Sequence, residues 1–371
     1  MKRTLWLSVS ILMTVTLLMS LSVAGLAQTS ENWNDILKAA SKEGKVVVYS
    51  TTSRITEAAK GFEKEFGIKV DSHLLSETEL IERVYREARA GIKSADLVLI
   101  EDFPSMKELL IAPGYLVNYI PPCAMKDVPA DMRNPLVFAH VSRIIGYNSE
   151  KYKTAPFESI WDLTTPQWKG KVMIRDVALT GEHQNAFTEL IRRSDELAAN
   201  YESHFGKKLQ LREANAGLEF MRRLAENDVI IMTSDTRIAE AVGKKGQADP
   251  PVGFFYVYSK HRDAEAKNLA ISAAVDLKPF AGYYYNIYLQ LASKPPHPNA
   301  AKALAEYLMT PAGFTPWSSD IGIYASNTAV KHHPQDKPWD WWESRLWTYN
   351  ADFAIRNRAI ALDTWIRSTS K

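Results

Sequence analysis

The chain has 371 residues, of which 46% are hydrophobic and 24% are charged. It is therefore long enough for two domains, and its composition is globular, which excludes a disordered block. The formal net charge is only +2, which gives no reason to expect a nucleic-acid partner.

Residues 1–27 are predicted to be a signal peptide. Lys2 and Arg3 form a positive n-region, a long apolar stretch follows, and Gly25 and Ala27 are the small residues at positions −3 and −1 of a cleavage site. The alternative is an uncleaved membrane anchor, because the apolar stretch is long. We favour cleavage, because Ser and Thr lower the hydrophobicity of that stretch. The mature protein is then exported and soluble.

Three strands alternate with helices in the next part of the chain. A short helix that stops at Gly44 leads to the strand "KVVVYS", and apolar residues at helical spacing run from Ile55 to Phe66. The strand "IKVDSHLL" comes next, and Ser76 and Glu79 form a capping box that opens another helix. "ADLVLIED" is apolar at most positions, as expected for a strand covered on both faces. This βαβαβ order predicts a parallel sheet with right-handed crossovers.

A second α/β set is predicted between about residues 140 and 270. "VFAHVSRIIGYNSEKY" is typical of a long strand that could run between two lobes. The strands "WKGKVMIRD" and "VIIMTSD" are each followed by helical patterns. Further on, "AGYYYNIYLQLAS" is predicted to be a strand and "PNAAKALAEYLMTPAG" a helix, before a Trp-rich tail with a helical end. The fold class is therefore α/β.

Polar turns follow predicted strands at three places. In an open parallel sheet, ligands bind outside the carboxyl ends of the strands, where the first N–H groups of helices lack partners. Short hydroxyl side chains add donors there without blocking the backbone. The predicted ligand-binding turns are Ser50, Thr51, Thr52 and Ser53; Thr180 and Gly181, with Glu182 and His183 in the same turn; and Ser234, Asp235, Thr236 and Arg237, preceded by Thr233. The alternative for each turn is ordinary N-capping, for which Ser, Thr and Asp are preferred.

Four further residues complete the predicted binding site. Ser76 opens a helix at the same edge of the sheet. Glu101 ends the third strand and either caps the next helix or faces the ligand, which would then carry a positive group. Arg175 either pairs with Asp176 or faces an anion. Tyr284 lies on a strand whose residues alternate between faces, so it either lines the cleft or packs in the core.

Nothing in the sequence places a nucleophile beside a base. The GxSxG, HExxH and P-loop motifs are absent from the sequence. Cys123, the only cysteine, is expected to be a half-buried small hydrophobe. His332 and His333 lack further ligands at metal-binding spacing. We therefore predict no catalytic residue, no metal ligand and no cofactor. An exported hydrolase with an active site between lobes is the rival class.

Several stretches resemble the bacterial periplasmic solute-binding proteins of the ferric-iron-binding type. They are "GKVVVYSTTSRITEAAKGFEKEFGIKV", "SADLVLIEDFP", "WDLTTPQWKGKV" and "LASKPPHPNAAKALAEYLMTPAG". The resemblance implies the type II two-lobed periplasmic-binding-protein fold, in which each lobe is a mostly parallel sheet flanked by helices and hinge strands join the lobes. It also implies a monomer in the periplasm that delivers a small-molecule ligand to an ABC transporter permease in the inner membrane. We expect lobe 1 at 29–137 plus 276–318, and lobe 2 at 138–275 plus 319–371.

The iron ligands of that family are not retained. Iron binders use a His just after the first strand, a Glu at the start of the helix after the second strand, and an adjacent Tyr pair after the strand that is "VIIMTSD" here. The corresponding regions offer Ser53 and Arg54; Ser76 with Glu77 and Glu79 nearby; and Asp235, Thr236 and Arg237. Ferric iron prefers hard, charged oxygen ligands. We therefore expect an organic anion, such as a phosphorylated compound, a phosphonate or a carboxylate, with ferric iron as the alternative.

Overall fold

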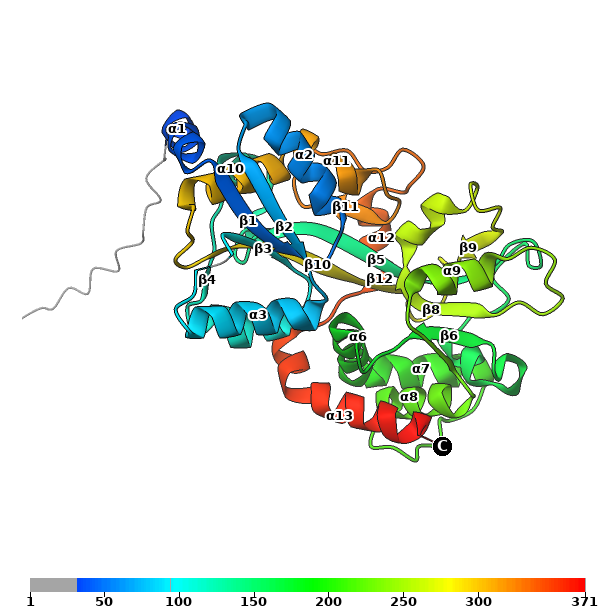
Figure 1. Cartoon of the computed structure of the whole chain (residues 1–371). Coiled ribbons are helices and arrows are strands. Elements are labelled where there is room, and N and C mark those ends of the chain that lie inside the picture. The colour runs from blue at the N-terminus through cyan, green and yellow to red at the C-terminus, as the bar shows by residue number, and fades with distance from the viewer. Residues whose placement is uncertain (1–31, 94, 371) are drawn as a thin grey trace, which may run out of the picture.

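The structure, a computed structural model, describes residues 32–93 and 95–370 (Figure 1). The predicted signal peptide lies outside these residues. Two lobes, each a sheet flanked by helices, are joined by long strands that run through the middle of the molecule. Within the described part of the chain, no helix is both long enough and apolar enough to span a membrane.

Lobe 1 contains the predicted βαβαβ unit. Its three strands are parallel, with Val46 beside Val70 and Val48 beside Leu97. Helix α1 ends at Gly44, whose φ of 72° suits a glycine, and Ser76 and Glu79 form the predicted capping box. The elements are α1 (Trp33–Glu43), β1 (Lys45–Ser50), α2 (Arg54–Phe66), β2 (Lys69–Leu74), α3 (Glu77–Arg89) and β3 (Leu97–Ile100).

Two long strands connect the lobes. β5 (Val137–Asn148) and β10 (Gly282–Ala292) pair antiparallel along most of their lengths. β10 pairs with β3 of lobe 1 near its C-terminal end, and β5 pairs with β8 (Val252–Val257) of lobe 2 near its own C-terminal end. The strand order is β2-β1-β3-β10-β5-β8-β6-β7. The prediction that "VFAHVSRIIGYN" runs between lobes is thus confirmed, and every residue of β5 is buried.

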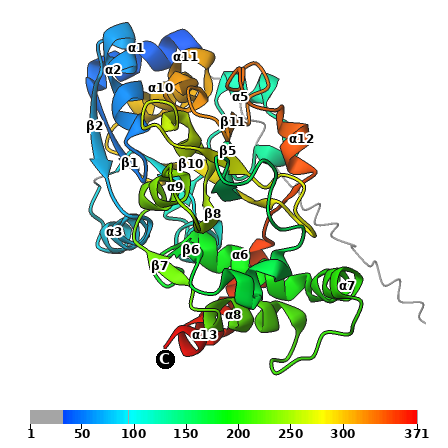
Figure 2. The same ribbon diagram turned by 90° about the vertical axis from the view of Figure 1, so that its right-hand side faces the viewer.

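Lobe 2 repeats the arrangement of a parallel sheet with helices at its edge. β6 pairs parallel with both β7 and β8. Figure 2 shows α6, α7 and α8 on one side of these strands and α9 nearer the other lobe. The further elements are β6 (Val172–Arg175), α6 (Gly181–Arg192), α7 (Ser194–Phe205), α8 (Ala216–Glu226), β7 (Ile230–Met232) and α9 (Asp235–Gly243).

Shorter elements and the C-terminal part complete the fold. The connecting elements are α4 (Phe103–Met106), η1 (Lys107–Ile111), β4 (Leu116–Val117), α5 (Pro122–Asp127), η2 (Ala130–Met132), η3 (Ile160–Thr164), η4 (Pro166–Trp168), η5 (Tyr258–Asp263) and β9 (Ile271–Ala273). After β10 come α10 (Pro298–Met309), α11 (Pro311–Ser318), β11 (Ile323–Ala325), α12 (Trp339–Glu343), β12 (Leu346–Trp347) and α13 (Ala351–Thr369).

The C-terminal helix α13 contacts both lobes. It packs against α6 and α8 of lobe 2 and against α4, which follows β3 of lobe 1. β11 adds to the edge of β5, at Ala139 to Val141. The two-lobed fold is as expected, whereas the residue boundaries of the lobes stay a prediction.

Candidate functional site

The carboxyl ends of the parallel strands of the two lobes face each other. The clearest sign is the close approach of Gly181, the first residue of α6 in lobe 2, to lobe 1. A Cβ atom at Gly181 would lie 2.9 Å from Asp102 Oδ2 and 3.2 Å from Glu77 Oε2. Glycine therefore lets the start of α6 meet two acidic residues of the opposite lobe.

Three glutamates meet at this contact, and we call them the acid cluster. Glu77 opens α3, Glu101 follows β3, and Glu182 lies in the first turn of α6. One carboxylate oxygen from each lies within 4.8 Å of the others. Both oxygens of Glu77 are buried and, while Glu77 is ionised, receive no hydrogen bond from residues 32–93 or 95–370, whereas a protonated Glu77 can share its proton with Glu182. Glu101 accepts a hydrogen bond from Thr51 Oγ1 at 2.6 Å.

Simultaneous ionisation of all three glutamates of the acid cluster is unfavourable. Burial and the neighbouring Glu182 raise the pKa of Glu101 to about 8, and the same two causes raise the pKa of Glu77 well above its ordinary value. Burial is the largest influence on Glu182 and acts against its ionisation, but Arg143, a hydrogen bond with Glu101 and the nearby His183 and Arg175 together outweigh burial and lower the pKa of that carboxyl. At neutral pH the empty cluster therefore holds protons unless a cation replaces them.

Guanidinium groups surround the acid cluster but are already paired with carboxylates of the protein. Arg143, on β5, is 1% exposed; its Nη1 donates to Asp235 Oδ1 at 3.0 Å, and its Nη2 to Glu182 Oε1 at 3.4 Å. Arg175 lies 3.6 Å from Asp235. Because Arg143 is buried in the strand that joins the lobes, it is a fixed part of the site.

A third guanidinium comes from α13. Arg358 Nη2 donates to Asp102 Oδ1 at 2.5 Å and also to Asn185 of α6, whose Nδ2 donates to Asp102 Oδ1 at 3.1 Å. Asp102 of lobe 1 is thus bonded to lobe 2 and to α13 at once. Five carboxylates, including Asp102 and Asp235, stand against three guanidiniums, so the fully ionised site carries an excess of negative charge.

The base of the site is aromatic. Tyr283 and Tyr285 are buried on the face of β10 that lies beside Arg143, whose guanidinium carbon is 5.5 Å from the Tyr285 ring centre. The hydroxyl of Tyr283 and both ring nitrogens of His183 are buried without a hydrogen-bond partner among the described residues. Burial, reinforced by Arg143, lowers the pKa of His183 well below its usual value, so its ring is neutral.

Some of the predicted residues converge on the acid cluster. Thr51 bonds to Glu101, Gly181 approaches Glu77 and Asp102, and Asp235 and Arg175 join through the Arg143 ion pairs. These contacts come from loops far apart in the sequence, which meet because each follows a parallel strand.

Other predicted residues act mainly as local caps. Ser50 Oγ accepts a hydrogen bond from Thr52 N, and Thr52 Oγ1 accepts one from Arg54 N. Ser76 and Ser234 cap α3 and α9, the latter by accepting from Thr236 N.

The remaining predicted residues divide between loop and surface positions. Thr180 is buried and donates to Asp176 O at 2.7 Å. Ser53 is exposed at the start of α2, and Arg237 is exposed on α9.

Tyr284 lies on the opposite face of β10 from Tyr283 and Tyr285. It packs edge-on against Trp339, with ring centres 4.8 Å apart, and lines a hollow together with Phe103. Side chains along β10 alternate between its two faces, as predicted. Of the two alternatives for Tyr284, the structure favours packing over lining the charged site, and its neighbours Tyr283 and Tyr285 face that site instead.

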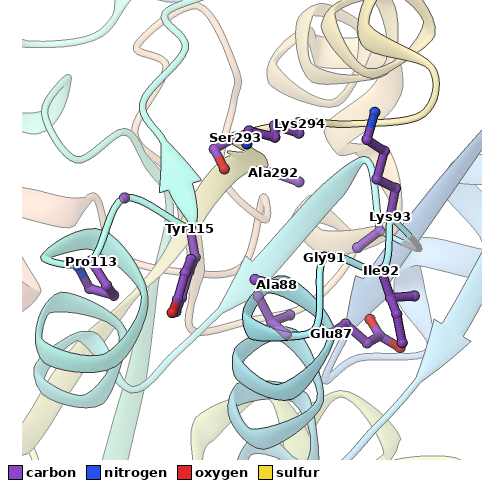
Figure 3. Close-up of a pocket in the computed structure, with 13 residues that line it drawn as sticks. Glu87, Ala88, Gly91, Ile92, Lys93, Pro113, Tyr115, Ala292, Ser293 and Lys294 are labelled. Carbon is purple, nitrogen blue, oxygen red and sulfur yellow. The ribbon is translucent and has the colours of Figure 1, made fainter.

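Another hollow lies at the far end of β3. Figure 3 shows Ala88, Gly91 and Ile92, at the end of α3, opposite Tyr115 and Ser293. It measures about 370 Å³. Its lining includes Ala95, which precedes β3, whereas Glu101 follows β3, so this hollow is separate from the acid cluster.

Sequence reasoning missed several residues of the site. Glu182 and His183 belong to a turn that was predicted to contact the ligand, but no role was assigned to either side chain. A single arginine inside the buried strand "VFAHVSRIIGYN" is a signal for Arg143, because a buried charge requires partners. Arg358 lies in an amphipathic C-terminal helix, and no local pattern distinguishes it.

A comparison with protein-family models shows the family of the chain, and solved structures show its fold. The family model of the bacterial extracellular solute-binding proteins matches residues 57–344. A comparison with curated proteins found no match. Among solved structures, iron-bound HitA from Pseudomonas aeruginosa is similar, with a TM-score of 0.69 and 16% identity over 87% of this chain and 99% of that chain.

Two more solved structures have the same fold. Apo ferric ion-binding protein A from Pasteurella haemolytica has a TM-score of 0.67 and 18% identity over 88% of this chain and 98% of that chain. The periplasmic binding protein AfuA from Actinobacillus pleuropneumoniae, with fructose-6-phosphate bound, has a TM-score of 0.67 and 14% identity over 88% and 98% of the two chains.

Proposed function

This chain belongs to the bacterial extracellular solute-binding proteins, and on that premise we propose that it captures a small solute bearing a positive charge and delivers it to an ABC permease in the inner membrane. The solute is held between the lobes, with its positive group against Glu77, Glu101 and Glu182. The protein works in the periplasm as a monomer, after removal of the signal peptide at residues 1–27.

The observation that carries this proposal is the carboxylate of Glu77. Both of its oxygens are buried, the ionised carboxylate lacks a donor from the described residues, and two more carboxylates lie within 4.8 Å. Leaving a buried charge unpaired costs several kcal/mol, so such a group is either protonated or meets a cation. A solute ammonium supplies three N–H donors, one for each glutamate.

An anion is less well supported by the geometry, although an organic anion was the expectation from the sequence. Arg143, Arg175 and Arg358 are each engaged by a carboxylate of the protein. Several of the helix N-termini that were expected to receive an anion are capped by side chains, as at Ser76 and Ser234. The positive group that Glu101 was predicted to imply, should it face the ligand, fits the acid cluster.

A metal ion is the second candidate for the same place. Three carboxylate oxygens within 4.8 Å form a set of hard ligands, and Glu77 opens the helix after the second strand, where iron binders use a Glu. Two features favour an ammonium over ferric iron. Arg143 lies 3.4 Å from Glu182, and the loop after β7 supplies Asp235 and Thr236 in place of a tyrosine pair.

The experiment is a thermal-shift screen of the metal-stripped mature protein against organic amines, metal ions, organic anions and neutral analogues. A solute at 100 times its dissociation constant stabilises the folded state by about 2.7 kcal/mol. We expect amines to stabilise the protein and matched neutral analogues to have no effect. Glu77→Gln should abolish the stabilisation, whereas Ser76→Ala, next to it but outside the cluster, should keep it.

Three results would contradict the proposal in different ways. Stabilisation by ferric iron without any by amines would assign the acid cluster to a metal. Stabilisation by anions alone would restore the expectation from the sequence. Conversion of a stabilising compound into products, followed by mass spectrometry, would favour the exported hydrolase.

A further inference from the structure

The C-terminal helix α13 reaches from one lobe to the other (Figure 1). Its C-terminal half is anchored on lobe 2, where the buried ring of Trp365 packs edge-on against Phe187 of α6, with ring centres 5.1 Å apart. Its N-terminal half contacts α4 and η1 of lobe 1, and Asp352 in its first turn pairs with Lys107 at 2.5 Å. A single helix therefore joins the two lobes.

Arg358, near the middle of α13, makes a bidentate contact with lobe 1. Its Nη1 donates to Asp102 Oδ2 at 2.9 Å, and its Nη2 donates to Asp102 Oδ1 at 2.5 Å. The side chain of Arg358 is 21% exposed and that of Asp102 is 7% exposed, against 43% and 59% for Lys107 and Asp352. Solvent therefore screens the Arg358 pair much less than the other pair. Two parallel charge-assisted bonds also fix the relative orientation of the two groups.

Asn185 of α6, which is fully buried, is the third member of this contact. Its side-chain oxygen accepts a hydrogen bond from Arg358 Nη2, and its Nδ2 donates to Asp102 Oδ1 at 3.1 Å. Asp102, Arg358 and Asn185 are thus bonded to one another pairwise, and they come from lobe 1, α13 and lobe 2. We call these three residues the latch. All three groups belong to the protein, so the latch forms with or without a solute.

The latch lies beside the acid cluster. Asp102 directly follows Glu101 in the chain, and Asn185 lies one helical turn after Glu182 on α6. Residues three apart lie on the same face of a helix, so a bond at Asn185 also holds Glu182 in place. The separation between Glu101 of lobe 1 and Glu182 of lobe 2 therefore depends on the latch.

The latch also engages the charge of Asp102. Burial acts to lower the pKa of Arg358, but the hydrogen bonds with Asp102 and the charge of that carboxylate outweigh burial and raise the pKa, so the guanidinium stays charged. Burial and Glu182 are the larger causes of the raised pKa of Glu77, and Asp102 adds to them. Because Arg358 pairs with Asp102, the three glutamates of the acid cluster are left to receive the solute cation.

We propose that Arg358 is a positioning residue, which acts through Asp102 and Asn185 to hold the lobes at the separation at which the acid cluster is complete. This inference rests on the proposed function, because the acid cluster is the site that the latch assembles. The latch favours the closed arrangement before the solute binds, so a larger fraction of the molecules is competent to hold the solute. It also has to break before the lobes open, so it slows dissociation of the solute.

The first test measures the distance between the lobes of the solute-free protein by double electron–electron resonance. Spin labels are attached at two exposed positions, with Lys64→Cys on α2 of lobe 1 and Ser203→Cys on α7 of lobe 2. Cys123→Ala removes the native thiol. We expect a population at the short distance of the closed lobes, and we expect the distribution to move to longer distances when the latch is removed.

The latch is removed by combining Arg358→Met with Asp102→Asn. The two changes together leave no buried charge without its partner, and Asn keeps the side-chain oxygen that caps α4. Arg358→Lys is a milder second variant, which keeps the charge beside Asp102 but loses the forked geometry, so it should lengthen the distances by less. Lys107→Met is the control, because it breaks the exposed contact of α13 with lobe 1 and should leave the distances unchanged.

The second test measures how fast an amine binds and leaves, by stopped-flow tryptophan fluorescence. The probe is the tightest-binding alkylamine of a series from methylamine to hexylamine. Removing the latch should raise the dissociation rate at least tenfold, which is the effect of losing one charge-assisted contact between the lobes, and should change the association rate much less. Loss of a purely structural contact would lower the melting temperature without lengthening the distance between the lobes.

The outcomes separate this inference from the proposed function. If the double variant and Arg358→Lys both keep the distances of the protein with the intact latch, the inference is overturned, whichever solute the protein binds. It is also overturned if Lys107→Met lengthens the distances as much as the double variant does, because Arg358 would then have no special part in closure. If the double variant lengthens the distances but no amine of the series binds to either protein, the latch is supported and the proposed function fails.

Discussion

Replacing Glu101 by Gln should change ligand binding and the stability of the empty protein in opposite directions. The Gln side chain has the same shape and can still accept the hydrogen bond that Thr51 donates at 2.6 Å. The substitution removes only the charge, so its effects report on the electrostatics of the acid cluster. In the empty protein that charge opposes Glu182, whereas in the complex it attracts the cation.

The magnitude follows from the separation within the cluster. Two unit charges 4.8 Å apart interact by about 3.5 kcal/mol at an effective dielectric constant of about 20. We therefore expect Glu101→Gln to weaken binding of an amine by roughly 300-fold. We expect the empty variant to be more stable than wild type by up to about 3 kcal/mol at pH 9, where Glu101 of the wild type is ionised.

The assay pairs calorimetry on the tightest-binding amine of the thermal-shift screen with urea denaturation of the empty protein. Glu79→Gln is the matched control, because it removes the same charge from an exposed capping position of α3 and keeps the capping box. A variant that lost both affinity and stability would refute the reasoning, since a damaged fold, not a relieved repulsion, would then explain the lost binding.

Three further predictions test separate parts of the account. The pKa of Glu101 is raised from 4.5 to about 8, so the folded protein binds that proton more tightly than the unfolded chain. The stability that this proton contributes should be complete below about pH 4.5 and be lost as the pH rises to about 8, by at most about 1.4 kcal/mol per pH unit. Melting curves between about pH 5 and about pH 8 measure this loss, and a flat profile over that range would exclude the raised pKa. Arg143→Met leaves Glu182 and Asp235 without their buried partner and should cost about 3–5 kcal/mol in urea denaturation, against a much smaller loss for Arg143→Lys; equal losses would mean that the charge is unimportant. Ser76→Ala removes the N-cap of α3 and should cost about 1 kcal/mol with unchanged affinity; a loss of affinity would make Ser76 a ligand contact.

The architecture could be predicted from local patterns. Helical spacing from Ile55 to Phe66, the capping box at Ser76 and the left-handed stop at Gly44 are each encoded within a few residues, and the structure confirms them. The long buried strand β5 was also recognisable, because twelve residues with few charges exceed an ordinary strand.

The chemistry of the site could be predicted only in part. Glu77, Glu101 and Glu182 come from three separate loops, and their mutual repulsion exists only once both lobes are in place. The hydroxyl-rich turns suggested an anion, but at Ser76 and Ser234 those hydroxyls satisfy their own helices. Capping and ligand binding use the same residue types, so only the fold can tell which one a turn performs.

The most direct test of the central idea is a crystal structure of the protein with the solute that it retains when it is isolated from a bacterial periplasm. The account predicts an ammonium group within hydrogen-bonding distance of Glu77, Glu101 and Glu182, enclosed by the two lobes. A phosphate, carboxylate or apolar group of the solute in that position would contradict it, and so would a solute bound outside the space between the lobes.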